Sequence, residues 1–309
     1  MDMLERYRGC LMGLAAGDAL GTTLEFKSPG SFEPIEDMVG GGPFNLQPGE
    51  WTDDTSMALC LAESLLACKG FDPVDQLERY YRWCMSGHLS SNGSCFDIGR
   101  TVSQAIHKYE STRKPFPGST DPYSAGNGSI MRLAPIPMAY ARDPVRAIAM
   151  AGESSRTTHG ATTAVDACRY LAGLIVGALR GDSKQLLLSA SYSPVEGLWD
   201  SSPLDEKIAE VARGSFKAKE PPDIAGTGYV VKSLEAALWA FHTTKTYKAG
   251  CLAAANLGND ADTTAAVYGE LAGAFYGEKA IPEAWRAMLA LKDVLEDFSE
   301  RLLKISETI

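Results

Sequence analysis

Residues 258–276 read GNDADTTAAVYGELAGAFY and combine the two features on which the expected fold depends. From Thr264 to Tyr276 the apolar residues are spaced as in a helix, and Gly269, Ala272 and Gly273 give it a small-residue face. Another helix backbone can pack closely against such a face. The preceding residues are polar and place two aspartates directly before the helix. The stretch therefore predicts a buried helix that begins beside carboxylates.

Helical spacing recurs along the rest of the chain. The dipeptides Asp72-Pro73, Asp143-Pro144 and Ser202-Pro203 each place a capping residue before a proline, which predicts that a helix begins there. Alternating β-type patterns are nearly absent, and residues 229–231 are the best short candidate for a strand. Further helices are expected over residues 4–16, 57–69, 98–109, 162–179, 229–242, 248–256, 282–290 and 292–304. Because no linker interrupts the pattern, we expect one compact all-α domain over residues 1–309, an orthogonal bundle of about a dozen helices.

Composition narrows the classes of function. The chain has 39 acidic and 29 basic residues and a net charge of -10, which disfavours extended nucleic-acid binding. Its longest apolar stretch, residues 171–179, is too short to span a bilayer, so no membrane insertion is expected. Seven scattered cysteines without a Cys-x-x-Cys pair, and an N-terminus without a signal-peptide pattern, indicate a cytoplasmic protein. We expect a monomer.

Two acidic segments each stand directly before an apolar helix: residues 50–55, which include Thr52-Asp53-Asp54, and residues 258–264, which include Asp260-Ala261-Asp262-Thr263. Hard divalent cations prefer several oxygen ligands, and two such segments could hold a pair of them. Either segment alone is better explained as a helix N-cap, where Asp and Thr are favoured in any case. Four aspartates in two matching contexts favour metal binding, because unpaired carboxylates repel one another.

A glycine-containing loop, residues 124–132, reads SAGNGSIMR. Its backbone N–H groups could cradle a phosphate with Arg132 as a counter-charge, although a Gly-Asn-Gly sequence also suits an ordinary turn. It matches neither the P-loop nor the dinucleotide fingerprint. The four histidines form no zinc motif, and no Gly-x-Ser-x-Gly elbow indicates a serine hydrolase. His107 and His242 are expected to be structural, and His159 is the candidate for a ligand contact.

Taken together, these segments resemble the ADP-ribosylglycohydrolase family, of the dinitrogenase-reductase-activating glycohydrolase type. The matching stretches occur in the family's order and span nearly the whole chain. They are residues 13–21 with Glu25, then residues 51–55, 95–99, 127–132, 158–159, 228–230, 237–239 and 256–263. One departure is Asn259, where members often carry glycine.

The resemblance implies an all-α fold with two Mg²⁺ or Mn²⁺ ions at the floor of a cleft. By position, their ligands would be Thr52, Asp53, Asp54, Asp260, Asp262 and Thr263. The phosphate loop would comprise Asn127, Gly128, Ser129 and Met131, while His159 and Tyr229 would line the cleft. Among the carboxylates, Asp53, Asp54 or Asp260 could be the general base. Glu25 matches a glutamate that gates the metal site in relatives acting on serine-linked ADP-ribose.

The implied activity is removal of ADP-ribose from a modified protein. Asp97 matches the arginine-directed branch, in which a carboxylate can pair with a guanidinium leaving group, although Asp97 also suits a helix N-cap before Ile98. We therefore predict hydrolysis of the N-glycosidic bond of ADP-ribosyl-arginine, with ADP-ribosylated protein and ADP-ribose as partners. Serine-linked ADP-ribose, O-acetyl-ADP-ribose and an ADP-ribosylated base are alternative substrates. A non-catalytic ADP-ribose sensor or a crystallin-like structural protein is the alternative of a different class.

Overall fold

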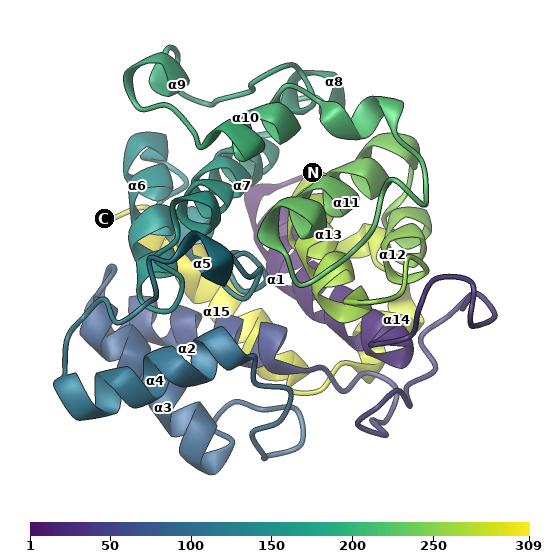
Figure 1. The fold of residues 1–309 in the computed structure, drawn as a ribbon, viewed down its shortest axis with the longest axis horizontal. Coiled ribbons are helices and arrows are strands. Elements are labelled where there is room, and N and C mark those ends of the chain that lie inside the picture. The colour runs from purple at the N-terminus through teal and green to yellow at the C-terminus, as the bar shows by residue number, and fades with distance from the viewer.

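The first helix of the chain and a helix from its last fifth run side by side through the centre of the molecule in a computed structural model of residues 1–309 (Figure 1). They are α1 (Met3–Gly21) and α13 (Ala261–Tyr276). The other helices surround them, and no β-strand is present, so the predicted all-α fold is confirmed. These helices are α2 (Asp53–Cys68), α3 (Pro73–Ser86), α4 (Arg100–Thr112), α5 (Pro135–Ala139), α6 (Pro144–Arg156), α7 (Thr162–Arg180), α8 (Lys184–Leu187), α9 (Leu198–Ser201), α10 (Glu206–Ala212), α11 (Val230–Thr243), α12 (Tyr247–Ala255), α14 (Glu283–Met288) and α15 (Lys292–Ser306).

The central pair packs backbone against backbone. Glycines recur every fourth residue along one face of α1, and each meets a small residue of α13 in antiparallel order. A Cβ atom added at any of these glycines would overlap a backbone carbonyl of α13. The facing pairs are Gly9 with Gly273, Gly13 with Gly269, Gly17 with Ala265, and Gly21 with Ala261. The predicted small-residue face of α13 is thus the contact with α1.

Hydrogen bonds from two side chains, the half-buried Arg6 and the buried Tyr247, join this pair to its neighbours. The Arg6 guanidinium donates to the carbonyl oxygens of Ala178 at 2.9 Å and Phe275 at 3.0 Å, and so joins the carboxyl ends of α7 and α13. The Tyr247 hydroxyl of α12 donates to the Gly13 carbonyl at 2.6 Å. Because α1 and α13 are antiparallel, the end of α1 lies beside the beginning of α13, where the acidic segment is.

Two of the three predicted proline starts are confirmed. The Asp72 carboxylate accepts from the N–H groups of Val74 and Asp75 at the start of α3, and Asp143 caps α6 in the same way. The prediction at Ser202-Pro203 is wrong, because the next helix, α10, begins at Glu206. Its cap is Asp205, a carboxylate that accepts from the Lys207 N–H at 3.0 Å.

Other boundaries differ in ways that bear on the acidic segments. Helix α2 begins at Asp53 rather than Met57, and α13 begins at Ala261 rather than Thr264. Three of the four aspartates therefore lie in first turns, and Asp260 is the N-cap of α13. Helix α4 begins at Arg100 after the N-cap Gly99, so the interpretation of Asp97 as an N-cap is wrong. Residues 229–231 form no strand: Tyr229 makes a single bridge with Gly126 and then caps α11.

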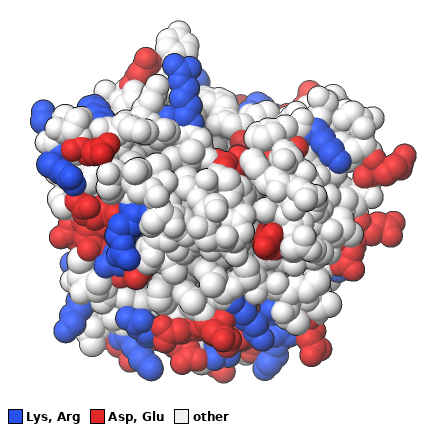
Figure 2. Space-filling view, turned by 90° about the horizontal axis from the view of Figure 1, so that it is seen from below, with Lys and Arg blue, Asp and Glu red and all other residues white.

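Apolar residues fill the interior of the fold, and charged residues lie on its surface. One cluster of 79 buried apolar residues runs through the molecule, and all seven cysteines are free, four of them buried. Helix α7 is long and apolar enough to cross a membrane, but 83% of its apolar window is buried inside the fold, as in a core helix. On the face in Figure 2, basic and acidic side chains are interspersed around a broad central area that has few charged side chains.

The α1–α13 contact predicts a large penalty for one added methyl group. We expect Gly13→Ala to destabilise the protein by about 3 kcal/mol, because its Cβ would meet backbone that cannot move without separating the helices. Gly152→Ala in α6 is the matched control, since its Cβ would meet only side-chain atoms of Arg169 and Val165. Thermal and urea unfolding measure both. Similar losses in the two variants would contradict the proposed role of this contact.

Candidate active site

The two acidic segments meet at the end of α1. The Thr52 hydroxyl lies 3.1 Å from the Asp54 carboxylate and 3.5 Å from the Asp262 carboxylate, which is 210 residues away in sequence. Asp53 and Asp54 lie in the first turn of α2, and Asp262 lies in the first turn of α13. Both helix N-termini therefore direct their positive dipole ends toward these carboxylates.

Asp18 of α1 fixes the geometry of the first segment. Its Oδ1 accepts from the N–H and hydroxyl of Thr52, both at 2.8 Å. Its Oδ2 accepts from the N–H of Thr55 at 3.0 Å and from the Thr55 hydroxyl at 2.7 Å. Asp18 is fully buried, and these four bonds occupy the four acceptor positions of its carboxylate. We interpret Asp18 as a positioning residue for the start of α2.

Glu25 fixes the second segment. Its Oε2 accepts from the Ala261 N–H at 2.8 Å and so caps α13 from a distant part of the chain. Next to it, the Phe26 N–H donates to the Asn259 carbonyl and the Asn259 N–H donates to the Lys27 carbonyl, both at 2.7 Å. Asn259 has a φ of 58°, a left-handed conformation that asparagine and glycine adopt readily. The departure at Asn259 is therefore compatible with the backbone geometry.

The carboxylates form a site that fits cations. Oxygen atoms of Asp18, Asp54 and Asp262 lie within 4.8 Å of one another, as do those of Glu25, Asp260 and Asp262. The Asp54 Oδ1 is buried without any hydrogen-bond partner in the protein. A buried anionic oxygen without a partner is costly, and a bound cation would satisfy it. The donor set, carboxylates with flanking hydroxyls, is the one that Mg²⁺ and Mn²⁺ prefer.

Burial and mutual repulsion oppose ionisation in this cluster. Burial, with the negative charges of Asp260 and Asp97, raises the pKa of Glu25 to about 8. Burial likewise raises the pKa of Asp97 to about 7. It also holds the pKa values of Asp53, Asp54 and Asp262 well above the usual range for aspartate, with neighbouring carboxylates adding to the effect. Cation binding would offset both the burial and the repulsion between carboxylates, because it favours the charged forms.

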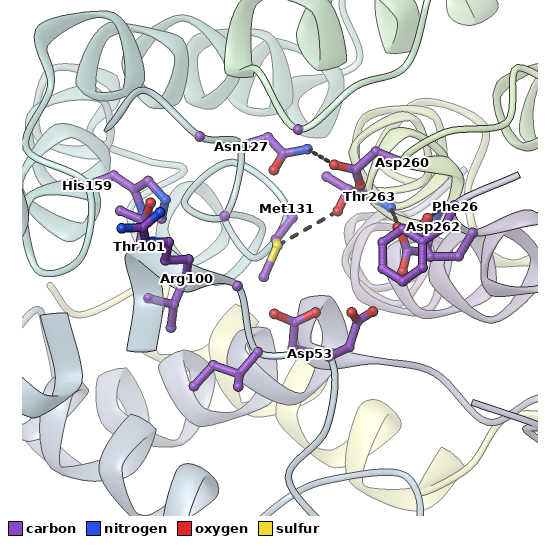
Figure 3. Close-up of a pocket in the computed structure, with 18 residues that line it drawn as sticks. Phe26, Asp53, Arg100, Thr101, Asn127, Met131, His159, Asp260, Asp262 and Thr263 are labelled. Carbon is purple, nitrogen blue, oxygen red and sulfur yellow. Dashed lines mark hydrogen bonds between the residues drawn. The ribbon is translucent and has the colours of Figure 1, made fainter. Parts of the chain in front are cut away.

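The glycine loop packs against the second acidic segment and against His159. Asn127 donates from Nδ2 to the Asp260 Oδ2 at 3.1 Å, as Figure 3 shows. A Cβ at Gly128 would lie 2.9 Å from the His159 ring, so glycine lets the ring and the loop meet. Burial and the nearby Arg132 lower the pKa of His159 to about 3, and the imidazole is neutral near pH 7.

The tautomer of His159 follows from its neighbours. The Arg132 guanidinium donates to the Thr158 hydroxyl at 2.6 Å, which leaves that hydroxyl free to donate to the His159 Nδ1 at 2.9 Å. The ring proton then resides on Nε2, which faces the glycine loop. A neutral N–H donor is thereby held beside the loop.

Two residues of the predicted phosphate loop face inward. Arg132 is 1% exposed and is bonded to the Gly128 carbonyl, so it stabilises the loop from behind and is not the expected counter-charge. The side chain of Ser129 is buried and accepts from the Ser155 hydroxyl at 2.9 Å. The cation that lines the cavity is Arg100, at the start of α4.

A cavity of about 370 Å³ joins these groups. Figure 3 shows Asp53 facing Asp260 and Asp262 across it, with Arg100, Thr101 and His159 at the other end. Tyr229 lies outside this cavity, in an adjoining depression with Tyr123 and Lys207. The lining residues are Glu25, Phe26, Asp53, Asp97, Ile98, Gly99, Arg100, Thr101, Val102, Gly126, Asn127, Gly128, Met131, His159, Gly228, Asp260, Asp262 and Thr263.

The structure adds residues to those expected from sequence. Asp18 stands within a conspicuous Gly-Asp-Ala sequence, but only its burial and four hydrogen bonds show that it positions Thr52 and Thr55. Arg100 and Thr101 were not expected in the site, since their segment resembles an ordinary amphipathic helix. The sequence did hold one indication of their role. Gly99 precedes them as the N-cap, so no side chain caps the first turn of α4.

Comparison with known proteins identifies the class. The chain is 40% identical over 301 residues to the ADP-ribosylarginine hydrolase Tri1 of Serratia proteamaculans, covering 97% of this chain and 80% of that protein. It is 31% identical over 297 residues to the ADP-ribosyl-dinitrogen reductase glycohydrolase of Rhodospirillum rubrum, covering 93% and 91%. A solved structure described as an ADP-ribosylglycohydrolase-related protein complex has a TM-score of 0.86 at 42% identity, covering 98% and 99%.

These matches define a hydrolase of glycosidic bonds. The chain matches the ADP-ribosylglycohydrolase family over residues 1–308 and belongs to that family, which confirms the resemblance found in the sequence.

The raised pKa values predict an unusual pH dependence for the metal-free protein. A carboxyl group whose pKa is higher in the folded state binds its proton more tightly there, so protonation stabilises the fold. For Glu25 this stabilisation is complete below its unfolded pKa of about 4 and is lost as pH rises through about 8. In EDTA we therefore expect the unfolding temperature to fall between pH 5 and pH 8, and Mg²⁺ to reduce the fall.

The matched variants for this measurement are Glu25→Gln, which should make the slope shallower, and Glu36→Gln at an exposed position, which should leave it unchanged. An unfolding temperature that rises with pH in EDTA would contradict the prediction.

Asp18→Asn tests the positioning role. The amide retains one acceptor oxygen and replaces the other with a donor that faces the Thr55 N–H or the Thr52 N–H. We expect affinity for Mn²⁺, measured by calorimetry, to fall about 10–100-fold, the usual effect of removing an outer partner of a metal site. Asp166→Asn, a buried aspartate paired with Arg169, is the control. Unchanged affinity in Asp18→Asn would rule out this role.

Proposed function

We propose that this protein is a dimetal-dependent hydrolase that removes ADP-ribose from arginine residues of modified proteins. The observation that carries the proposal is the cavity itself, in which a buried carboxylate cluster stands at one end and Arg100 and His159 stand at the other, with the glycine loop between them. The names of the Serratia and Rhodospirillum relatives, both ADP-ribosyl hydrolases, support the substrate class.

The two ends of the cavity set the direction of the substrate. The Gly126 and Gly128 backbone, the His159 Nε2–H and Arg100 supply neutral and cationic donors for a diphosphate. The distal ribose would then extend toward Asp53, Asp260 and Asp262. Asn127 connects the loop to the carboxylates, because its backbone is part of the loop and its side-chain amide donates to the Asp260 carboxylate.

The metal ligands in this proposal are Thr52, Asp53, Asp54, Asp260, Asp262 and Thr263. Two Mg²⁺ or Mn²⁺ ions held there would neutralise the carboxylates and supply Lewis acidity to the ribose hydroxyls and to water. The flanking hydroxyls of Thr52 and Thr263 complete an oxygen-only donor set.

The three candidates for the general base differ in whether their side chains line the cavity. Asp54 is fully buried and does not line the cavity, whereas Asp53 and Asp260 do. We therefore assign proton transfer from the attacking water to Asp53 or Asp260, and a supporting role to Asp54. Glu25 lines the cavity and, besides capping α13, contributes its carboxyl group to the cluster with Asp260 and Asp262. Glycosidic cleavage proceeds through an oxocarbenium-like state, which nearby carboxylates stabilise.

In this proposal, Asp97 selects arginine-linked ADP-ribose as the substrate. It lines the same end of the cavity as Asp53 and Glu25, and its φ of 58° is an uncommon backbone conformation for aspartate. A carboxylate there can form paired hydrogen bonds with a guanidinium leaving group. The protein partner is thus an ADP-ribosylated substrate, and the monomeric state, the cytoplasmic location, the single domain over residues 1–309 and the absence of extended nucleic-acid binding remain predictions.

The first test is release of ADP-ribose from arginine-modified protein with Mg²⁺, with Mn²⁺ and with EDTA. We expect cation-dependent release, and a loss of more than about 100-fold in Asp262→Ala, since even outer partners of metal sites contribute up to that factor. Asp97→Asn should retain cation binding and lose activity on the arginine-linked substrate. Asp166→Asn again serves as the buried control.

The other outcomes are informative. Release only from serine-linked ADP-ribose, O-acetyl-ADP-ribose or an ADP-ribosylated base would overturn the arginine assignment. Thermal stabilisation by ADP-ribose without turnover of any substrate would favour a sensor. Neither stabilisation nor release would favour a structural protein.

A further inference from the structure

Three phenylalanines form a row that leads outward from the cavity mouth. Phe26 lines the cavity, and its ring centroid lies 6.3 Å from that of Phe44, which lies 5.3 Å from that of Phe96. The three come from separate loops: one after α1, one in the turn 41–46 and one before α4. We call these residues the aromatic row.

Phe26 presents an exposed ring from a backbone that hydrogen bonds hold in place. It is 67% exposed, and its φ of 60° lies in the left-handed region, which bulky residues rarely adopt. The two hydrogen bonds between residues 26–27 and Asn259 fix the backbone there. An exposed aromatic ring on a strained backbone at a cavity mouth is typical of a binding contact.

The row lies at the end of the cavity where the acceptor must leave. Phe26 directly follows Glu25 and Phe96 directly precedes Asp97, so the row stands on the side of the cavity that these two carboxylates line. With ADP-ribose oriented as proposed above, the bond to the modified residue faces this side. The following inference therefore rests on the proposed function.

We propose that the aromatic row binds the polypeptide around the ADP-ribosylated arginine and makes the enzyme selective for modified protein over free ADP-ribosyl-arginine. Aromatic faces stack on guanidinium groups and on peptide planes, and the carboxylates beside them complement the positive charge. Phe44 and Phe96 lie beyond the cavity lining, where a free amino acid has no atoms to contact them but a polypeptide does.

The test compares two substrates of the same linkage, an arginine-modified protein and free ADP-ribosyl-arginine. For Phe44→Ala we expect kcat/KM on the modified protein to fall about tenfold through KM, a moderate interface contact. Activity on the free compound should be unchanged, because Phe44 does not line the cavity. Phe44→Leu, which keeps an apolar side chain without a ring, is the second variant should alanine unfold the loop. Leu186→Ala, exposed on α8, is the surface control.

Three other outcomes would contradict this inference or the function on which it rests. Equal losses on both substrates, or no loss on either, would overturn the role of the row in recognising polypeptide. A wild-type dimer that Phe44→Ala dissociates would show that the row contacts a second copy of the chain and would also overturn it. A wild-type protein that cleaves neither substrate would instead overturn the proposed function.

Discussion

The close contact between α1 and α13 is the constraint on which the rest of the structure depends. Four small-residue pairs leave no space for a Cβ atom, so the two backbones have one relative position and one register. That register places Asp18 and Glu25, at the end of α1, beside the first turn of α13. A shift of one helical turn, about 5 Å, would separate them.

The cluster at this junction is an unfavourable arrangement that the fold stabilises from several sides. Six carboxylates share a largely buried space, where desolvation and mutual repulsion both oppose ionisation. The opposing contributions are the N-termini of α2 and α13, the threonine hydroxyls and the Asn127 amide. These leave Asp54 Oδ1 without a partner. A bound cation would satisfy this oxygen and favour the charged forms of its neighbours, which supports the metal site proposed above.

The local features of the sequence were sufficient for the helices and for the two acidic segments. Capping at Asp72 and Asp143 depends on adjacent residues alone, and periodicity found the helical segments. Ser202-Pro203 misled because the stronger cap, Asp205, comes three residues later. Contacts between distant segments could not be predicted this way. Arg132 looked available for a phosphate, and only the packing of Tyr80 and Thr158 around it shows that it is buried.

The proposed metal site and the residues proposed to select the substrate lie on different parts of the structure. The metal ligands proposed here are the N-caps and first-turn residues of α2 and α13, at the junction that the α1–α13 contact fixes. Asp97 and the aromatic row lie on loops, each anchored to the scaffold by few bonds, and loops tolerate substitution. A helical scaffold of this kind can therefore keep one hydrolytic site while the loops at its mouth change the linkage and the protein that it accepts.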